Sequence, residues 1–238
     1  MPSLPVVATL AGATTTGRSA RIAGALYVIV ITGGLCASII QESLTVSGDA
    51  AGTAAAIAAH ESLWRWGIGV HLIYLAVPTT VMNVLVYRIF KQVQPTLSLL
   101  AFASGIVSAA IEAAALLPLC VPLVMAESPS ALAAVGEGDR QAFVYLAIRL
   151  SEIGFGLSLF FFSGFCAAIG TAIMRSGLVP RAIGAMMVVA GACYFVSTLA
   201  TVVAPGLAHL LFPWIIVPCF FGEASLAIWL LVKGTRST

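Results

Sequence analysis

Charged residues are scarce in this sequence. Of its 238 residues, 8% are Asp, Glu, Lys or Arg, whereas 61% are hydrophobic. Soluble domains carry roughly 25% charged residues, so a soluble chain of this length could not cover so much apolar surface. The scarcity of charge excludes an ordinary soluble domain and indicates lipid as the solvent. The small net charge of +2 gives no reason to expect nucleic-acid binding.

Paired cysteines and catalytic motifs are missing as well. The five cysteines lie in apolar stretches, and no two of them have C-x-x-C spacing: Cys36, Cys120, Cys166, Cys193 and Cys219. This pattern predicts neither a disulfide framework nor a zinc site. There is no phosphate-binding loop, H-E-x-x-H or G-x-S-x-G motif, and no Asp lies in a long apolar stretch. The sequence therefore indicates no metal and no cofactor, and it disfavours an enzyme.

Long apolar stretches are what the sequence does contain. A helix needs about 20 apolar residues to cross the hydrocarbon core of a bilayer. Six stretches are long enough: 22–41, 66–87, 97–125, 142–174, 179–203 and 210–232. Irregular backbone cannot face lipid, so each stretch predicts a helix. The expected fold is all-α, a polytopic bundle of six transmembrane helices forming one domain over residues 18–238. A disordered cytoplasmic tail is expected over residues 1–17.

The basic residues predict the orientation of this bundle. Eight of the eleven Lys and Arg residues fall near the termini or in the connections after spans two and four: Arg18, Arg21, Arg88, Lys91, Arg175, Arg181, Lys233 and Arg236. The expected outer loops, 42–65 and 126–141, hold six of the nine acidic residues. Basic segments stay on the cytoplasmic side of a membrane. Both termini are therefore predicted to be cytoplasmic.

Local signals add detail to the spans and loops. The run Ser47-Gly48-Asp49 predicts the N-cap of an alanine-rich helix that extends through His60 in the first outer loop. Five prolines lie in spans two, three and six and predict kinks, because proline removes a backbone donor: Pro78, Pro118, Pro122, Pro213 and Pro218. Aromatic side chains predict interfacial belts, with Trp64, Trp66, Tyr145 and Trp214 at the outer ends and Tyr27, Tyr87 and Trp229 at the inner ends.

Four motifs resemble a known family of bacterial multi-pass membrane proteins. They are RIAGALY at 21–27, VYR at 86–88 with Lys91, RSGLVPRAIG at 175–184 and GEASLAIWLLVKG at 222–234. Together they are similar to the family called domain of unknown function 4386, and the resemblance extends from about residue 21 to residue 234. It implies a bacterial inner-membrane protein. It implies no activity, because the family has none assigned.

Six polar side chains within the spans are the candidate ligand- or ion-binding residues: His71, Asn83, Glu112, Arg149, Glu152 and Glu223. Ionisable groups inside a membrane are costly, so they are functional candidates by default. Arg149 and Glu152 are three residues apart on a helix and can pair. Helical rise places the ionisable groups at similar depths, so we expect them to meet in one pocket. Spans two, three, four and six would surround that pocket, with spans one and five outside.

Three functions are compatible with this pattern. A buried carboxyl such as Glu112 or Glu223 needs a counter-charge, water, a cation or a proton. The first possibility is a protein that binds or moves a proton, a cation or a small polar ligand at the carboxylate cluster. The second is a non-catalytic membrane subunit that recognises a partner protein or a lipid. The third is a membrane-embedded enzyme acting on a lipid or quinone. The same residues also fit a structural role as hydrogen bonds between helices.

Overall fold

The computed structural model describes residues 4–127 and 133–235, with side chains from residue 17 onward, and every regular element in this part of the chain is a helix. Six segments are long and apolar enough to cross a membrane: Gly17–Leu44, Glu61–Phe90, Pro95–Glu127, Glu137–Ser176, Arg181–Val203 and Ile216–Lys233. The all-α fold and the six predicted spans are therefore confirmed.

The helices that build these spans differ in length and continuity. Single helices form four spans: α1 (Leu4–Leu44), α7 (Glu137–Ser176), α8 (Arg181–Val203) and α10 (Ile216–Lys233). Span two consists of α3 (Glu61–Tyr74) and α4 (Thr80–Phe90), and span three of α5 (Pro95–Ala115) and α6 (Val121–Glu127). Two short helices, α2 (Ala50–Ala59) and α9 (Pro205–Leu211), lie in the connections.

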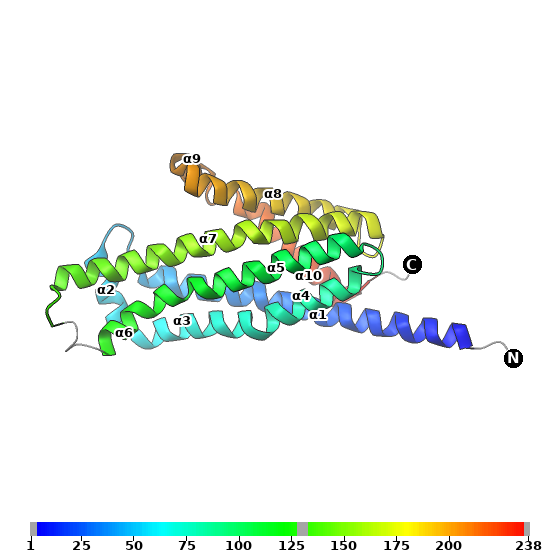
Figure 1. Cartoon of the computed structure of the whole chain (residues 1–238), viewed down its shortest axis with the longest axis horizontal. Coiled ribbons are helices and arrows are strands. Elements are labelled where there is room, and N and C mark those ends of the chain that lie inside the picture. Colours follow the sequence, from blue (N-terminus) through cyan, green and yellow to red (C-terminus); the bar gives the residue numbers. More distant parts are fainter. Residues whose placement is uncertain (1–3, 128–132, 236–238) are drawn as a thin grey trace.

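The six spans form a closed ring. Helix α1 packs against α10, α10 against α8, α8 against α7, α7 against α5 and α5 against α4, which returns to α1. Figure 1 shows an elongated bundle in which both ends of the chain lie at the same end, with α2 and the start of α7 at the opposite end. The first and last spans are thus neighbours, and all six helices can contribute side chains to the interior.

The start of α1 differs from the sequence expectation. Helix α1 begins at Leu4, whereas a disordered tail was predicted over residues 1–17. Residues 1–3 lie outside the described part of the chain. Residues 6–16 carry neither charge nor proline. Adding a residue to an existing helix is far easier than nucleating one. Span one therefore acts as the nucleus from which the helix extends.

The first outer loop is largely helical. Helix α1 runs to Leu44 and α3 begins at Glu61, so only the segment around α2 connects them. The carboxylate of Asp49 accepts the backbone N–H of Gly52 at 2.8 Å, which satisfies a donor at the start of α2. The predicted N-cap and the predicted alanine-rich helix are both confirmed. In the second outer loop, residues 128–132 lie outside the described residues, and α7 begins at Glu137.

Prolines interrupt the second, third and sixth spans. Pro78 lies in a π-helical turn over Leu75–Thr79, and Pro118 lies in a 3-10 turn over Leu117–Cys120. Span six begins at Ile216 and not at residue 210, because a turn containing Pro213 separates α9 from α10. The loss of a backbone donor at each proline explains why the α-helical bonding pattern changes there.

Small residues bring the central helices close together. A Cβ atom on Gly170 of α7 would lie 2.6 Å from the carbonyl oxygen of Gly184 in α8, and one on Gly184 would lie 2.7 Å from the oxygen of Gly170. No larger residue fits at either position without moving a helix. These two glycines therefore allow spans four and five to pack closely.

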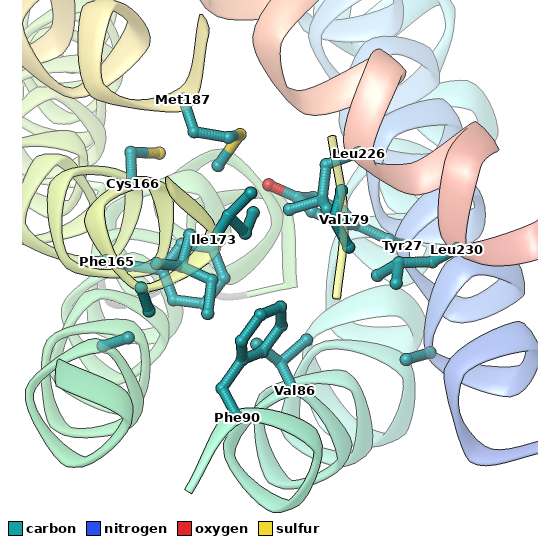
Figure 2. Close-up of a cluster of buried hydrophobic side chains, with 14 of the residues drawn as sticks. Tyr27, Val86, Phe90, Phe165, Cys166, Ile173, Val179, Met187, Leu226 and Leu230 are labelled. Carbon is teal, nitrogen blue, oxygen red and sulfur yellow. The ribbon is translucent and has the colours of Figure 1, made fainter. Parts of the chain in front are cut away.

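Two apolar clusters fill the ring, one in each half of the bundle. The cluster nearer the chain termini joins side chains from six helices and the α7–α8 connection, and Figure 2 labels these members: Tyr27, Val86, Phe90, Phe165, Cys166, Ile173, Val179, Met187, Leu226 and Leu230. The other cluster contains Trp64, Tyr74 and Leu119. Trp64 lies at the outer end of span two, but it is 1% exposed and its indole N–H donates to the carbonyl of Leu119 at 2.9 Å, so it packs against protein and not against lipid headgroups. Trp66 and Trp214 are exposed.

Candidate functional site

Glu112 of α5 is bound by two side chains of α3. The Nε2 atom of His71 lies 3.0 Å from Glu112 Oε1, and the hydroxyl of Tyr74 donates to the same oxygen at 2.5 Å. His71 and Tyr74 are three residues apart, so they lie on one face of the helix, where their rings stack with centroids 4.9 Å apart. The ring of Phe155 from α7 packs against His71 in a T-shaped contact with ring centroids 6.4 Å apart. The structure therefore brings together two of the predicted site residues, His71 and Glu112.

His71 is buried and has one unused ring nitrogen. Its exposed fraction is 5%, and Nδ1 has no hydrogen-bond partner among the described residues. A neutral imidazole carries one donor and one acceptor nitrogen, whereas a charged one carries two donors. With Nε2 on Glu112 and Nδ1 unengaged, neither form is imposed by the surrounding side chains. Nε2 is therefore the ring nitrogen through which His71 contacts Glu112.

Glu223 of α10 lies in the interior between spans one and five. Tyr27 of α1 donates its hydroxyl to Glu223 Oε2 at 3.1 Å, and Tyr194 of α8 donates to Oε1 at 2.5 Å. Tyr27 is 0% exposed, while Glu223 and Tyr194 are each 9% exposed. Figure 2 shows Tyr27 extending among the labelled side chains of α8 and α10. Each oxygen of the carboxyl thus has one tyrosine donor.

Glu112 and Glu223 are each held by tyrosine hydroxyls. Tyr27 and Tyr194 belong to the apolar cluster near the termini, and Tyr74 belongs to the cluster of the opposite half. The two carboxyls and three tyrosines therefore form a polar layer where the two apolar clusters meet. We refer to Glu112, Glu223, His71, Tyr27, Tyr74 and Tyr194 as the carboxyl–tyrosine layer.

Arg149 and Glu152 do not join this layer. They form an ion pair with each other, as their spacing predicted, but their side chains are 57% and 46% exposed. They occupy the outer surface of α7, and neither is hydrogen-bonded or ion-paired to His71, Glu112 or Glu223. The expectation that these residues meet His71, Glu112 and Glu223 in one pocket is therefore not met.

Asn83 of α4 is buried apart from the carboxyls. Its amide group donates to the carbonyl of Thr79 at 2.9 Å, and its own carbonyl oxygen has no hydrogen-bond partner within the described segments. That oxygen lies 2.0 Å from where a Cβ atom on Gly105 would stand. Asn83 therefore packs against the backbone of α5, and no ligand role follows from its position.

The prediction that spans one and five stand outside the site is wrong. Tyr27 and Tyr194 come from those spans, and they make the direct hydrogen bonds to Glu223. Sequence reasoning assigned Tyr27 to the interface and did not select Tyr74 or Tyr194. The available signal was a tyrosine well inside an apolar stretch, since a buried hydroxyl usually has a hydrogen-bond partner.

The residues brought together are suited to hydrogen bonding and proton exchange. In the described part of the chain, no three His, Cys, Asp or Glu side chains are placed to hold a metal ion together. The comparison with protein families gives a match over residues 22–234 to the domain of unknown function 4386. The chain belongs to this DUF4386 family. No curated protein and no solved structure matches this DUF4386 chain.

Proposed function

We propose that this DUF4386 protein is a protein of the bacterial inner membrane that binds and releases protons at Glu223 and Glu112. The setting of Glu223 carries the proposal. Its carboxyl is buried, accepts two tyrosine hydroxyls and has no basic partner among the described residues. Ionisable groups without a counter-charge are expensive inside a membrane and mark functional sites.

A proton suits the surroundings of Glu223 better than a metal cation does. Both carboxyl oxygens already accept an O–H group, so a cation would have to displace at least one tyrosine. A hydroxyl can donate or accept, and a protonated carboxyl has one donor of its own. The same contacts with Tyr27 and Tyr194 therefore serve both protonation states after rotation of a hydroxyl hydrogen.

His71 supports the same proposal at Glu112. Imidazole is the side chain that most readily changes charge near neutral pH. The 3.0 Å contact between His71 Nε2 and Glu112 Oε1 allows a proton to pass between the two groups, and the unpartnered Nδ1 offers a second position for a proton.

The charge distribution supports the membrane and the orientation. The sequence contains eight basic and no acidic residues in its terminal segments and in the connections after spans two and four. Figure 1 shows those connections at the same end as both termini. The positive-inside rule assigns that end to the cytoplasm.

The two other functions have less support. An enzyme acting on a membrane lipid needs its reactive group exposed to a lipid-accessible groove, but His71 is 5% exposed. A non-catalytic subunit needs no proton exchange. If the effect of changing the carboxyl–tyrosine layer on thermal stability did not vary with pH, that function would be supported. The following experiment separates it from the proposal.

The test is the pH dependence of thermal stability for the purified protein in detergent. Thermal unfolding of wild type, Glu223→Gln and Glu152→Gln is measured between about pH 4 and pH 9, a range that includes the usual titration of carboxyl and imidazole groups in proteins. Glutamine cannot exchange a proton, so the Tm difference between wild type and Glu223→Gln should change with pH. One proton contributes at most about 1.4 kcal/mol per pH unit, or about 3–6 °C for a chain of this size.

Glu152→Gln is the matched control, because it makes the same chemical change at an exposed ion pair. Its Tm difference from wild type should stay nearly constant with pH. Infrared difference spectra between high and low pH should show a carboxyl band that Glu223→Gln removes and Glu152→Gln keeps. The proposal is overturned if the Glu223→Gln and wild-type curves run parallel across the range and no carboxyl band is lost.

A further inference from the structure

A groove runs along the outer surface between α4 and α5, at the end of the bundle that carries both termini. Its volume is about 520 Å³, and Val84, Tyr87, Arg88, Lys91, Leu99 and Phe102 line it. Arg88 is in the last turn of α4, Lys91 directly follows that helix, and α5 begins at Pro95. Figure 1 shows the α4–α5 connection beside the C-terminal end. The groove therefore opens where the bundle reaches the membrane interface.

The polar end of the groove carries two positive charges without acidic partners. Arg88 and Lys91 are both exposed, and neither forms an ion pair within the described residues. The sequence has no Asp or Glu between Glu61 and Glu112. The Nζ atom of Lys91 lies 5.6 Å from the centre of the Tyr87 ring, so an aromatic face holds this ammonium group beside Arg88. This end of the groove can bind an anion.

The rest of the groove is apolar and leads toward the middle of the membrane. Val84 lies one helical turn before Arg88 on the same face of α4, and its side chain is 37% exposed. On α5, Leu99 is 56% exposed, and Phe102 lies one turn further along. The rings of Phe102 and Tyr87 pack across the groove with centroids 5.5 Å apart. A groove with positive charges at one end and apolar side chains along the rest is expected to bind an amphiphile.

We propose that this groove binds an anionic phospholipid, with the phosphate between Arg88 and Lys91 and one acyl chain along Val84, Leu99 and Phe102. The charge complementarity selects an anionic headgroup, because each basic residue near an anionic membrane surface favours such lipids several-fold. The apolar wall selects a lipid over a free phosphate ion. This inference does not depend on proton exchange in the carboxyl–tyrosine layer, which lies in the interior of the ring.

The test measures lipid binding to the purified protein by native mass spectrometry, with phosphatidylglycerol and zwitterionic phosphatidylcholine as probes. Wild type should prefer phosphatidylglycerol about ten- to thirty-fold, the product of two such contributions. The double variant Arg88→Gln/Lys91→Gln should bind both lipids about equally. The matched control is Arg175→Gln/Arg181→Gln, which removes two exposed charges from the end of α7 and the start of α8, and it should keep the preference.

Two outcomes would overturn the proposal. One is a preference for phosphatidylglycerol that persists in Arg88→Gln/Lys91→Gln or that falls equally in the control variant. In either case, lipid binding would reflect the overall positive charge at this end of the bundle and not the groove. The other concerns Leu99→Asn, which keeps both charges and replaces part of the apolar wall. It should weaken phosphatidylglycerol binding several-fold, and undiminished binding would mean that the groove holds a phosphate group alone.

Discussion

At the scale of single residues, the hydroxyl groups of three tyrosines determine how the interior carboxyls are held. Tyr27 and Tyr194 each donate to a different oxygen of Glu223, and Tyr74 donates to Glu112. A hydrogen bond to a charged or strongly polar buried group is more costly to lose than one at the surface, because the remaining partner stays desolvated. Loss of a single tyrosine hydroxyl should therefore lower the free energy of unfolding by a measurable amount.

Tyr194→Phe should lower the stability of the protein by about 1–3 kcal/mol, because it leaves Glu223 Oε1 without its donor. For a chain of this size the Tm in detergent should fall by roughly 2–4 °C per kcal/mol. Tyr87→Phe removes the same atom from a hydroxyl that makes no hydrogen bond to the described residues, and its Tm should stay within about a degree of wild type. Equal Tm values for the two variants would contradict the assigned hydrogen bond.

At the scale of elements, interruptions in the helices position the polar side chains. The nitrogen of Pro78 cannot donate to the carbonyl of Tyr74, and the hydroxyl of Thr79 binds that carbonyl instead at 2.9 Å. The π-helical turn follows directly after Tyr74. The break in span two therefore lies beside the side chain that binds Glu112, as is common for π-turns at functional sites.

Contact between the first and last spans closes the ring, and Gly24 allows it. A Cβ atom on Gly24 would lie 2.3 Å from the backbone nitrogen of Leu231 in α10. Gly24→Ala should push α1 away from α10 and reduce stability by about 1–3 kcal/mol, as overpacking does elsewhere. Thermal unfolding in detergent measures this effect.

Gly156→Ala is the control for this substitution, because a Cβ atom there would meet nothing within 4 Å. Alanine is the better helix former, so Gly156→Ala should leave stability unchanged or raise it slightly. If Gly24→Ala is as stable as Gly156→Ala, the close approach of α1 and α10 is not required for the fold.

At the scale of the whole molecule, the ring places both termini at one end, and the unbalanced basic residues gather there. With a cytoplasmic C-terminus, a fluorescent protein fused after Thr238 should fluoresce in cells, and alkaline phosphatase fused there should be inactive. Phosphatase inserted after Val135, between α6 and α7, should be active, because that connection lies at the opposite end. Active phosphatase at the C-terminus would reverse the proposed orientation.

The fold and the site differ in how far the sequence predicted them. Six spans, their limits to within a few residues in most cases, and the Asp49 cap follow from local patterns, because lipid demands a long apolar helix regardless of neighbours. Glu112, Glu223 and His71 were selected because charge is rare in such helices. Their partners could not be selected the same way, since Tyr27 and Tyr194 look like ordinary span residues.

The sequence by itself determined the solvent, the number of spans and the family, because each depends on composition or motifs read along one chain. Only the tertiary structure decided which polar residues meet. It turned Arg149 and Glu152 outward and brought Tyr27, Tyr194 and Glu223 together from three helices. The physical reason is that a side chain's depth follows from its place along a helix, whereas its direction depends on how each helix is rotated against its neighbours.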